Sequence, residues 1–103
     1  MSTLAIKNST PFAQKVRIAE DSLSVDLTDG RTISVPLSWF PRLLSGTAIE
    51  RNNWRMIGQG EGIHWEDLDE DISIEGLILG CPSQESQSSL QNWLKQRQKS
   101  KQD

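Results

Sequence analysis

Residues 16–35, VRIAEDSLSVDLTDGRTISV, decide the fold of this 103-residue chain. Apolar side chains occupy every second position in three short runs: Val16 and Ile18, Leu23 to Leu27, and Ile33 and Val35. This period of two is typical of β-strands that bury one face. We therefore expect three consecutive antiparallel strands, a β-meander, with the apolar residues on its inner face.

The same apolar positions constrain the first turn, because a slip of one residue would turn the buried side chains to the other face. Val16 must lie opposite Val25, and this requires an even-numbered loop. We expect either Glu20-Asp21 or residues 19–22 to form that loop.

The second turn contains Asp29-Gly30, a pair that is common in two-residue hairpin loops. A two-residue loop, however, would place Val25 opposite Ser34 and bury the wrong face. A three-residue loop, Thr28 to Gly30, places Val25 opposite Ile33 and leaves the glycine in the left-handed position of a bulged turn. We predict the three-residue loop.

Short helices are expected after the meander. Pro36 ends the third strand because it has no N–H to donate. Ser38 is predicted to cap a helix through Leu44, with Pro41 in its first turn and Gly46 ending it. Residues 47–50, TAIE, form a capping box that opens a second short helix through about residue 53.

A second hairpin-like piece is predicted from Trp54 to Trp65, with a Gly-rich loop between two short strands and residues 63–65 as the final strand. Ser73 then caps a helix that Gly80 ends. The remaining sequence is rich in Gln and Ser. It predicts a weakly amphipathic helix over residues 82–99, followed by a disordered end at residues 100–103.

The fold class expected from these elements is α+β: a small antiparallel β-meander packed against short helices, with a C-terminal helix. Residues 1–11 are predicted to be a flexible N-terminus, residues 12–82 a single α+β domain, and residues 83–103 a polar C-terminal helix with a disordered tail.

Composition excludes several classes of protein. The net charge is −3, whereas a general nucleic-acid binder needs a basic face, so direct nucleic-acid binding is not expected. The one cysteine, Cys81, cannot form an internal disulfide. The sequence has no apolar run long enough to span a bilayer and no apolar centre of a signal peptide, so we expect a soluble cytoplasmic protein without a membrane role.

The stretch GQGEGIHWEDLDEDISIEGL, residues 58–77, holds the only histidine and seven of the fourteen acidic residues. Asp67, Asp69 and Asp71 match the beginning of a calcium-binding loop. That loop requires Gly and Glu where this chain has Ile72 and Ile78, so the match fails. One histidine and one cysteine are too few for a zinc site. We predict no metal and no cofactor.

His64 could form an acid–base pair with Glu61 or Asp67, but no nucleophile accompanies it. A partly buried histidine held by a hydrogen bond between Ile63 and Trp65 is the more ordinary interpretation. The glycines at 58, 60 and 62 lack the spacing of a dinucleotide-binding loop, and we expect a flexible turn.

Acidic residues just before Ser73 interact favourably with the positive end of the dipole of the helix that follows, but this interaction does not account for all seven acids. Either Arg42, Arg51 and Arg55 balance them within the domain, or a basic partner does so in trans. Trp93, on an otherwise polar helix, either packs that helix onto the domain or anchors a partner. The candidate partner surface comprises Glu61, His64, Glu66, Asp67, Asp69, Glu70, Asp71, Glu75 and Trp93.

The segments DGRTISVPLSWFPRL, residues 29–43, and AIERNNWRMIGQGEGIHWEDLDEDISIEGLILG, residues 48–80, resemble the bacterial family called domain of unknown function 2442. The resemblance covers residues 16–80, and Glu66 stands where the family often has proline. It implies a small α+β protein without assigned catalytic residues. Some members are fused to helix-turn-helix domains, and others are encoded beside a second small domain, which suggests toxin–antitoxin-like pairs. Only one helix fits after Gly80, so no helix-turn-helix is expected here.

Three functions are therefore open. The first is a non-enzymatic interaction module, an antitoxin-like member of a two-protein pair, whose acidic segment meets a basic partner; a homo-oligomer is also compatible. The second is a DNA-associated regulator acting through its partner or through the basic tail, residues 95–101. The third is a metal-dependent or acid–base hydrolase centred on His64 with Asp67 and Asp69.

Overall fold

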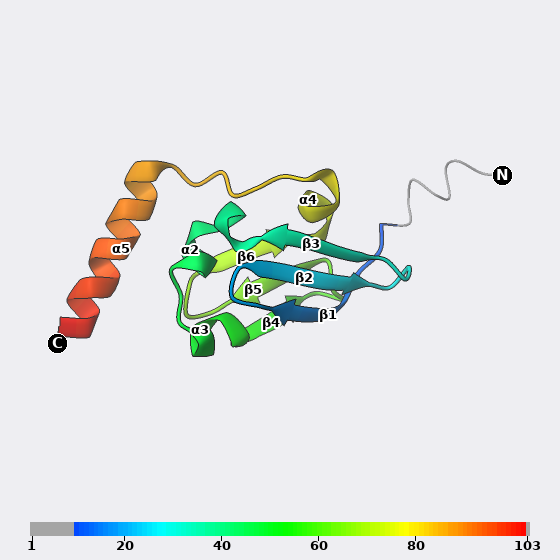
Figure 1. Cartoon of the computed structure of the whole chain (residues 1–103), viewed down its shortest axis with the longest axis horizontal. Helices are drawn as coiled ribbons and strands as arrows, with labels where there is room; N and C mark the ends of the chain where they lie inside the picture. Colours follow the sequence, from blue (N-terminus) through cyan, green and yellow to red (C-terminus); the bar gives the residue numbers. More distant parts are fainter. Residues whose placement is uncertain (1–9, 103) are drawn as a thin grey trace.

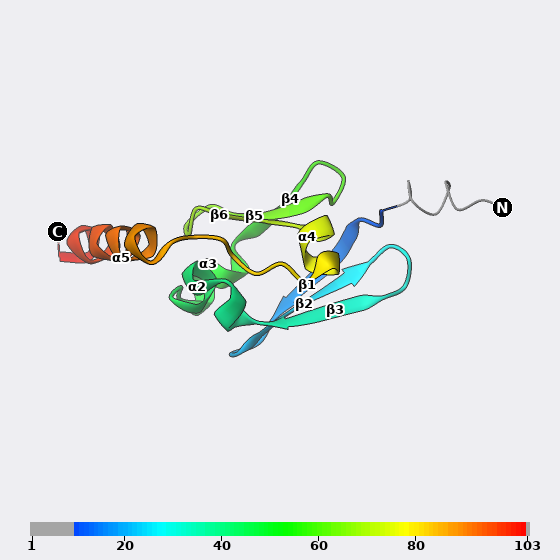
Figure 2. The same cartoon turned by 90° about the horizontal axis from the view of Figure 1, so that it is seen from above.

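Two three-stranded antiparallel meanders lie face to face in a computed structural model of the chain, which describes residues 10–102 (Figures 1 and 2). Most of the predicted flexible N-terminus, and Asp103, lie outside the described residues. The first sheet comprises β1 (Ala13–Ile18), β2 (Ser22–Leu27) and β3 (Thr32–Pro36). The second comprises β4 (Trp54–Ile57), β5 (Gly62–Trp65) and β6 (Glu70–Ser73). The α+β class is confirmed.

The first sheet has the predicted register at both turns. Val16 pairs with Val25, and the N–H of Ala19 donates to the carbonyl of Ser22 at 2.9 Å, so Glu20-Asp21 forms a two-residue turn. Val25 pairs with Ile33, as the three-residue loop requires. Gly30 has φ 95°, the left-handed conformation predicted for it.

A β-bulge interrupts β1 near its start. Ala13 pairs with Leu27 and Lys15 pairs with Asp26, so Gln14 is the extra residue on this strand. The bulge lets both Ala13 and Val16 face the core, although three positions separate them. Simple alternation does not predict this arrangement.

The second sheet has a strand that the sequence pattern does not reveal. Glu70 to Ser73 form β6, which pairs with β5, so the sheet does not end at Trp65 as predicted. Ile72 is the only apolar residue among these four, and acidic residues are depleted in strands. Ile72 is buried, which shows that one inward side chain is enough when the neighbouring strand supplies the rest.

Three short helical segments connect the sheets: η1 (Leu37–Trp39), α2 (Pro41–Leu44) and α3 (Ala48–Asn52). The single helix predicted from Ser38 is wrong. The residue before a proline is disfavoured in the helical conformation, and Phe40 has φ −129° and ψ 85°, so it separates η1 from α2. The predicted capping box of α3 is confirmed, with Thr47 and Glu50 each accepting a backbone N–H of the other.

Helix α4 (Ile74–Leu79) begins and ends where the sequence predicts. The Ser73 hydroxyl accepts the N–H of Gly76 at 2.9 Å, and Gly80 ends the helix with φ 76°. Helix α5 (Gln87–Gln102) begins five residues later than predicted and continues to Gln102, within the segment predicted to be disordered. It stands at one end of the molecule, beyond the sheets (Figure 1).

The core lies between the two sheets. Leu23 and Val25 of β2 are completely buried, as are Ile63 and Trp65 of β5. The indole N–H of Trp65 donates to the carbonyl of Arg51 at 2.8 Å, which ties α3 to the second sheet. Alternation turns His64 of β5 and Asp71 of β6 outward, and both belong to the candidate site.

Candidate functional site

The β5–β6 hairpin carries the acidic segment and separates it into two groups. Gly62 pairs with Ser73 at one end of the hairpin, so Glu61 and Glu75 lie just beyond that end. Trp65 pairs with Glu70 at the other end, where residues 66–69 form the turn. The seven acids are therefore not one continuous surface.

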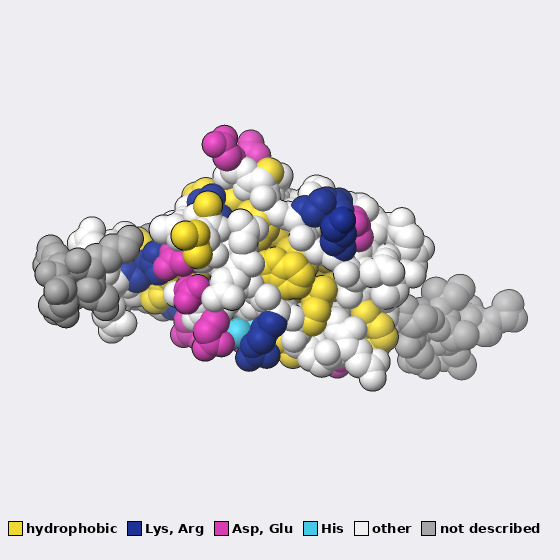
Figure 3. Space-filling view, turned by 90° about the horizontal axis from the view of Figure 1, so that it is seen from below, with side chains coloured by type: hydrophobic (Ala, Val, Ile, Leu, Met, Phe, Trp, Pro, Cys, Tyr) yellow, Lys and Arg dark blue, Asp and Glu magenta, His cyan; other side chains and the backbone are white. Residues whose placement is uncertain are grey.

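Three polar residues form a row across the outer face of the second sheet. Arg55 of β4 pairs with His64 of β5, which pairs with Asp71 of β6. Figure 3 shows the histidine between basic and acidic side chains. The face therefore places one cation and one carboxylate on opposite sides of the imidazole.

His64 is held by carboxylates at both ring nitrogens. Nδ1 is hydrogen-bonded to the Asp71 carboxylate, and Nε2 lies 3.3 Å from Oε1 of Glu66. The Asp71 hydrogen bond raises the pKa of His64, with Glu66 adding to the effect and Arg55 opposing it. The side chain is only 17% exposed. This is a histidine held by hydrogen bonds, and no described serine, threonine or cysteine is bonded to it.

The structure does not bring the other predicted partners to His64. Asp67 accepts a hydrogen bond from the side-chain amide of Asn53 at 2.9 Å. Glu61 accepts the backbone N–H of Gln59 at 3.0 Å within the Gly-rich turn. Asp69 faces Arg42 instead. The catalytic set of His64, Asp67 and Asp69 is therefore not assembled.

Arg42, on α2, contacts the β5–β6 turn. It binds Glu85 in a bidentate manner, with Nε and Nη2 at 2.9 and 2.6 Å from carboxylate oxygens. Its Nη1 donates to the carbonyl of Asp69 at 3.2 Å and lies 3.7 Å from the Asp69 carboxylate. Arg42 thus joins the turn to the segment that precedes α5. Arg51 does not serve this purpose, because it donates to the carbonyls of Leu43 and Leu44.

Glu70 differs from the other acids because it points inward. It shares the inner face of β6 with Ile72 and is half-buried. Burial raises the pKa of Glu70 to about 7, and the nearby carboxylates of Glu85, Asp71 and Asp69 act in the same direction while Arg42 opposes them.

Trp93 attaches α5 to the domain. The guanidinium carbons of Arg42 and Arg97 lie 4.8 and 4.7 Å from its ring centroid, within the range of cation–π contacts. Arg97 also pairs with Glu50 of α3 at 2.8 Å, and this hydrogen bond lowers the pKa of Glu50 to about 2. One basic residue of the tail therefore docks within the chain, on α3 rather than on the acidic segment.

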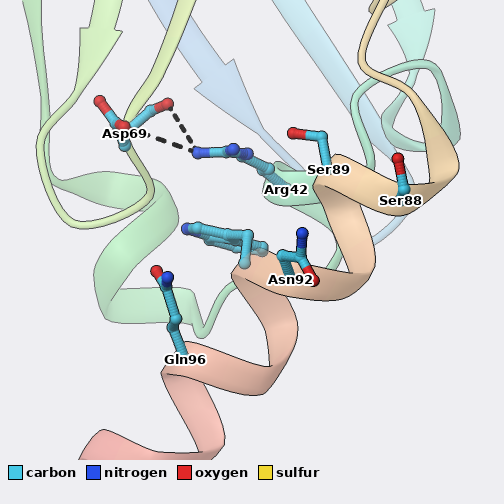
Figure 4. A pocket seen from close by; sticks show the side chains of 7 residues that line it. Arg42, Asp69, Ser88, Ser89, Asn92 and Gln96 are labelled. Atoms are coloured by element: carbon cyan, nitrogen blue, oxygen red, sulfur yellow. Dashed lines mark hydrogen bonds and ion pairs between the residues drawn. The ribbon is translucent and has the colours of Figure 1, made fainter.

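A shallow polar depression of about 450 Å³ lies where α5 meets the β5–β6 turn. Figure 4 shows Arg42 reaching toward Asp69 on one side and Ser89, Asn92 and Gln96 of α5 on the other. Because Arg42 is already bound by Glu85 and by the turn, the depression offers no free cation of its own to an anion.

Sequence reasoning missed two members of this network. Glu85 and Glu50 carry no motif that connects them to Arg42 or Arg97. The only signal was the spacing of Trp93 and Arg97, four residues apart on one predicted helix, which places them on the same face.

The described residues form neither a metal-binding cluster nor a membrane-spanning helix. Across residues 10–102, no three histidine, cysteine or acidic side chains are grouped closely enough to hold a metal ion. Cys81 is exposed and has no disulfide partner. No described helix has the length and apolar character needed to cross a membrane.

Comparisons with known proteins agree with this fold. A protein of unknown function from Rhodospirillum rubrum, solved by crystallography, is 31% identical and superposes with a TM-score of 0.64 over 77% of this chain and 95% of that one. An uncharacterized protein from Chromobacterium violaceum, solved by NMR, superposes with the same TM-score over 78% of this chain and 75% of that one. At 18% identity it shows the fold alone.

No protein with a curated description matches the chain. The model of the family described as protein of unknown function (DUF2442) matches residues 13–83, which is more than half of the sequence. The match includes both sheets, the capped helices and the acidic segment. The chain therefore belongs to the DUF2442 family.

Proposed function

We propose that this protein is a non-enzymatic interaction module that binds a basic surface of a partner protein. The contact region is the acidic surface, defined here as Glu66, Asp67, Asp69 and Asp71 at and beside the β5–β6 turn. The proposal depends chiefly on their exposure: the side chains of Glu66, Asp69 and Asp71 are 72%, 87% and 68% exposed.

The charge balance at this turn supports a partner in trans. Arg42 approaches the turn, but its side chain is only 15% exposed and is shared with Glu85. His64 adds a positive charge only when it is protonated. Crowded carboxylates repel one another in the free protein, and a basic partner would relieve that repulsion and accelerate association.

The organisation of the polar groups favours binding over reaction. His64 is bonded to carboxylates on both sides, and no nucleophile among the described residues accompanies it. The alternative of a hydrolase centred on His64 therefore has less support. A DNA-associated role through the basic tail also has less support, since Arg97 is engaged by Glu50 and Trp93.

The kind of partner is suggested by the family resemblance. We expect a small protein encoded beside this one, with the present chain as the antitoxin-like member of the pair and the complex forming in the cytoplasm. A basic patch on that protein would face the acidic surface.

Co-expression with the product of the neighbouring gene tests the proposal. The two proteins should co-purify, and calorimetry should show that the double variant Glu66→Lys, Asp67→Lys weakens binding by at least about tenfold. Neither residue contacts Arg42, so the fold should be retained.

The matched control is Glu20→Lys, Asp21→Lys, which introduces the same change of charge in the β1–β2 turn of the other sheet. This variant should bind within about twofold of the parent, because long-range charge alone is screened at physiological salt. Equal weakening by both variants, or by neither, would contradict a specific role for the acidic surface.

A further inference from the structure

The four open edges of the two sheets differ in how they are guarded. Natural proteins protect edge strands with bulges, prolines and charged side chains. β1 has its bulge at Gln14 and an exposed Lys15, β3 ends at Pro36, and β6 carries Glu70 and Asp71. β4 has no proline and no bulge, Arg55 is its one charged residue, and it pairs with β5 alone among the described strands.

The backbone of β4 has hydrogen-bonding groups on its open side. In an antiparallel ladder, successive residues of a strand direct these groups to opposite sides. The N–H of Ile74 donates to the carbonyl of Glu61 at 2.9 Å. The backbone N–H and C=O groups of the odd-numbered residues along β5 therefore point toward β6, and those of the even-numbered residues point toward β4. His64 therefore bonds across to Arg55, and the N–H and C=O groups of Trp54 and Met56 turn toward the open edge.

Trp54 and Met56 lie on the inner face of β4, and Arg55 and Ile57 lie on its outer face. Trp54 and Met56 are half-buried and pack against the core, and Ile57 remains 37% exposed. The open edges β1 and β4 lie on the same side of the molecule, and Figure 3, seen from that side, shows hydrophobic side chains exposed at its centre. Among the described side chains, Arg55 joins no ion pair, although it is exposed.

We infer that the β4 edge binds an extended segment of a partner protein, which adds a strand to the second sheet. Main-chain hydrogen bonds to Trp54 and Met56 hold the segment, and alternate side chains select it. Apolar residues of the segment extend the core beside Trp54 and Met56, and an acidic residue pairs with Arg55. The recognised segment therefore alternates apolar and acidic residues.

The charge on β4 argues against a second copy of this chain as the occupant. Two β4 strands paired with each other would place two Arg55 side chains on one sheet face, where like charges destabilise pairing. The β4 edge shares a sheet face with Asp71 of the acidic surface, two strands away, but it prefers a segment of the opposite charge, so this inference does not depend on the function proposed above.

Titration of the ¹⁵N-labelled full-length protein with synthetic peptides tests the inference. One soluble ten-residue peptide alternates Val with Glu, and its matched control alternates Val with Lys. The Glu peptide should shift the amide signals of Trp54 and Met56 and slow their exchange with solvent. It should bind at least about fivefold more tightly than the Lys peptide, because it gains rather than loses a cross-strand charge pair.

Reversing the charge at Arg55 of β4 tests the same preference from the side of the protein. Arg55→Glu should exchange the preference between the two peptides, whereas Lys15→Glu on β1 should leave it unchanged. Binding by neither peptide, shifts centred on β1, or an unchanged preference in Arg55→Glu would each overturn the inference. Without peptide, slower amide exchange of Trp54 and Met56 at higher protein concentration would also overturn the inference, because a second copy of the chain would then occupy the edge.

Discussion

Glu70 and Asp71 are neighbours in the sequence with opposite surroundings. The alternation of β6 turns Glu70 toward the core and Asp71 toward His64 on the outer face. One carboxyl group therefore has a pKa raised by burial, while the other raises the pKa of a histidine. Two adjacent acids thus affect the pH dependence of the protein in different ways.

Replacement of Glu70 by Gln should stabilise the protein at alkaline pH. The pKa of Glu70 is about 7 in the folded protein, against an ordinary value of 4.5, so ionisation costs stability as pH rises between these values. Because the group is partly exposed, we expect a gain of about 1 kcal/mol at pH 8 and none below pH 4.

Urea unfolding across this pH range measures the difference, with Glu20→Gln in the exposed β1–β2 turn as the control. A Glu70→Gln variant whose stability parallels that of the parent at every pH would contradict an inward, half-buried carboxyl group.

Replacement of Asp71 by Asn should lower the pKa of His64. The raised pKa means that the protonated histidine contributes stability below the unfolded value of 6.5, and that this contribution is lost as pH rises through the folded value. An NMR titration of the His64 ring measures the change directly. Asp67→Asn is the control, since Asp67 contacts Asn53, and it should leave the titration where it is in the parent. Identical titrations of Asp71→Asn and the parent would rule out the pairing.

The sequence was sufficient to locate the acidic site but not to assign its contacts. His64 and its acids could be found because they are concentrated in one stretch. The predicted partners of His64, Glu61 and Asp67, were wrong, because the register of the unrecognised strand β6 places Asp71 beside it. Glu85 and Glu50 could not be found, since contacts across 43 and 47 residues leave no local pattern.

At the level of elements, the first sheet was predictable and the second only in part. β2 and β3 alternate cleanly, so parity fixed both the register and the loop length. β6 has one buried apolar residue, Ile72, and its strand conformation depends on pairing with β5 rather than on its own composition. The division of the first helix at Phe40 follows from Pro41, a signal that the sequence itself contains.

Gly60 joins the two sheets and should be the least replaceable glycine. Its φ is 110°, and an added Cβ would lie 2.6 Å from the carbonyl oxygen of Ala13. Gly30 also has a positive φ, 95°, but its Cβ would meet open space. We therefore expect Gly60→Ala to cost about 3 kcal/mol or more and Gly30→Ala about 1 kcal/mol.

The free energy of unfolding in urea measures both costs. Both glycines have a positive φ, so the difference between the two costs reports the clash of the added Cβ with Ala13. Equal costs for the two variants would mean that the sheets can separate at Gly60 without penalty.

At the level of the whole molecule, α5 depends on a few side chains for its position. A polar helix of 16 residues is marginal alone in water, so its order requires the contacts of Trp93 with Arg42 and Arg97. Trp93→Ala should therefore reduce helical circular dichroism at 222 nm and cost about 1–2 kcal/mol, while the amide spectrum of the two sheets stays unchanged.

Gln91→Ala, an exposed change on the same helix, is the matched control and should preserve the helical signal. Full helicity in Trp93→Ala would show that α5 is held by other contacts.

The hydrogen bond of 2.7 Å between the N–H of Ala13 and the carbonyl of Gly60 also bears on the order of folding. Each meander consists of contacts that are local in sequence, and such contacts form early and fast. The Ala13–Gly60 contact closes a long loop between the two halves, so we expect it to form after the transition state. Substitutions that disrupt this contact should therefore raise the unfolding rate and leave the refolding rate nearly unchanged.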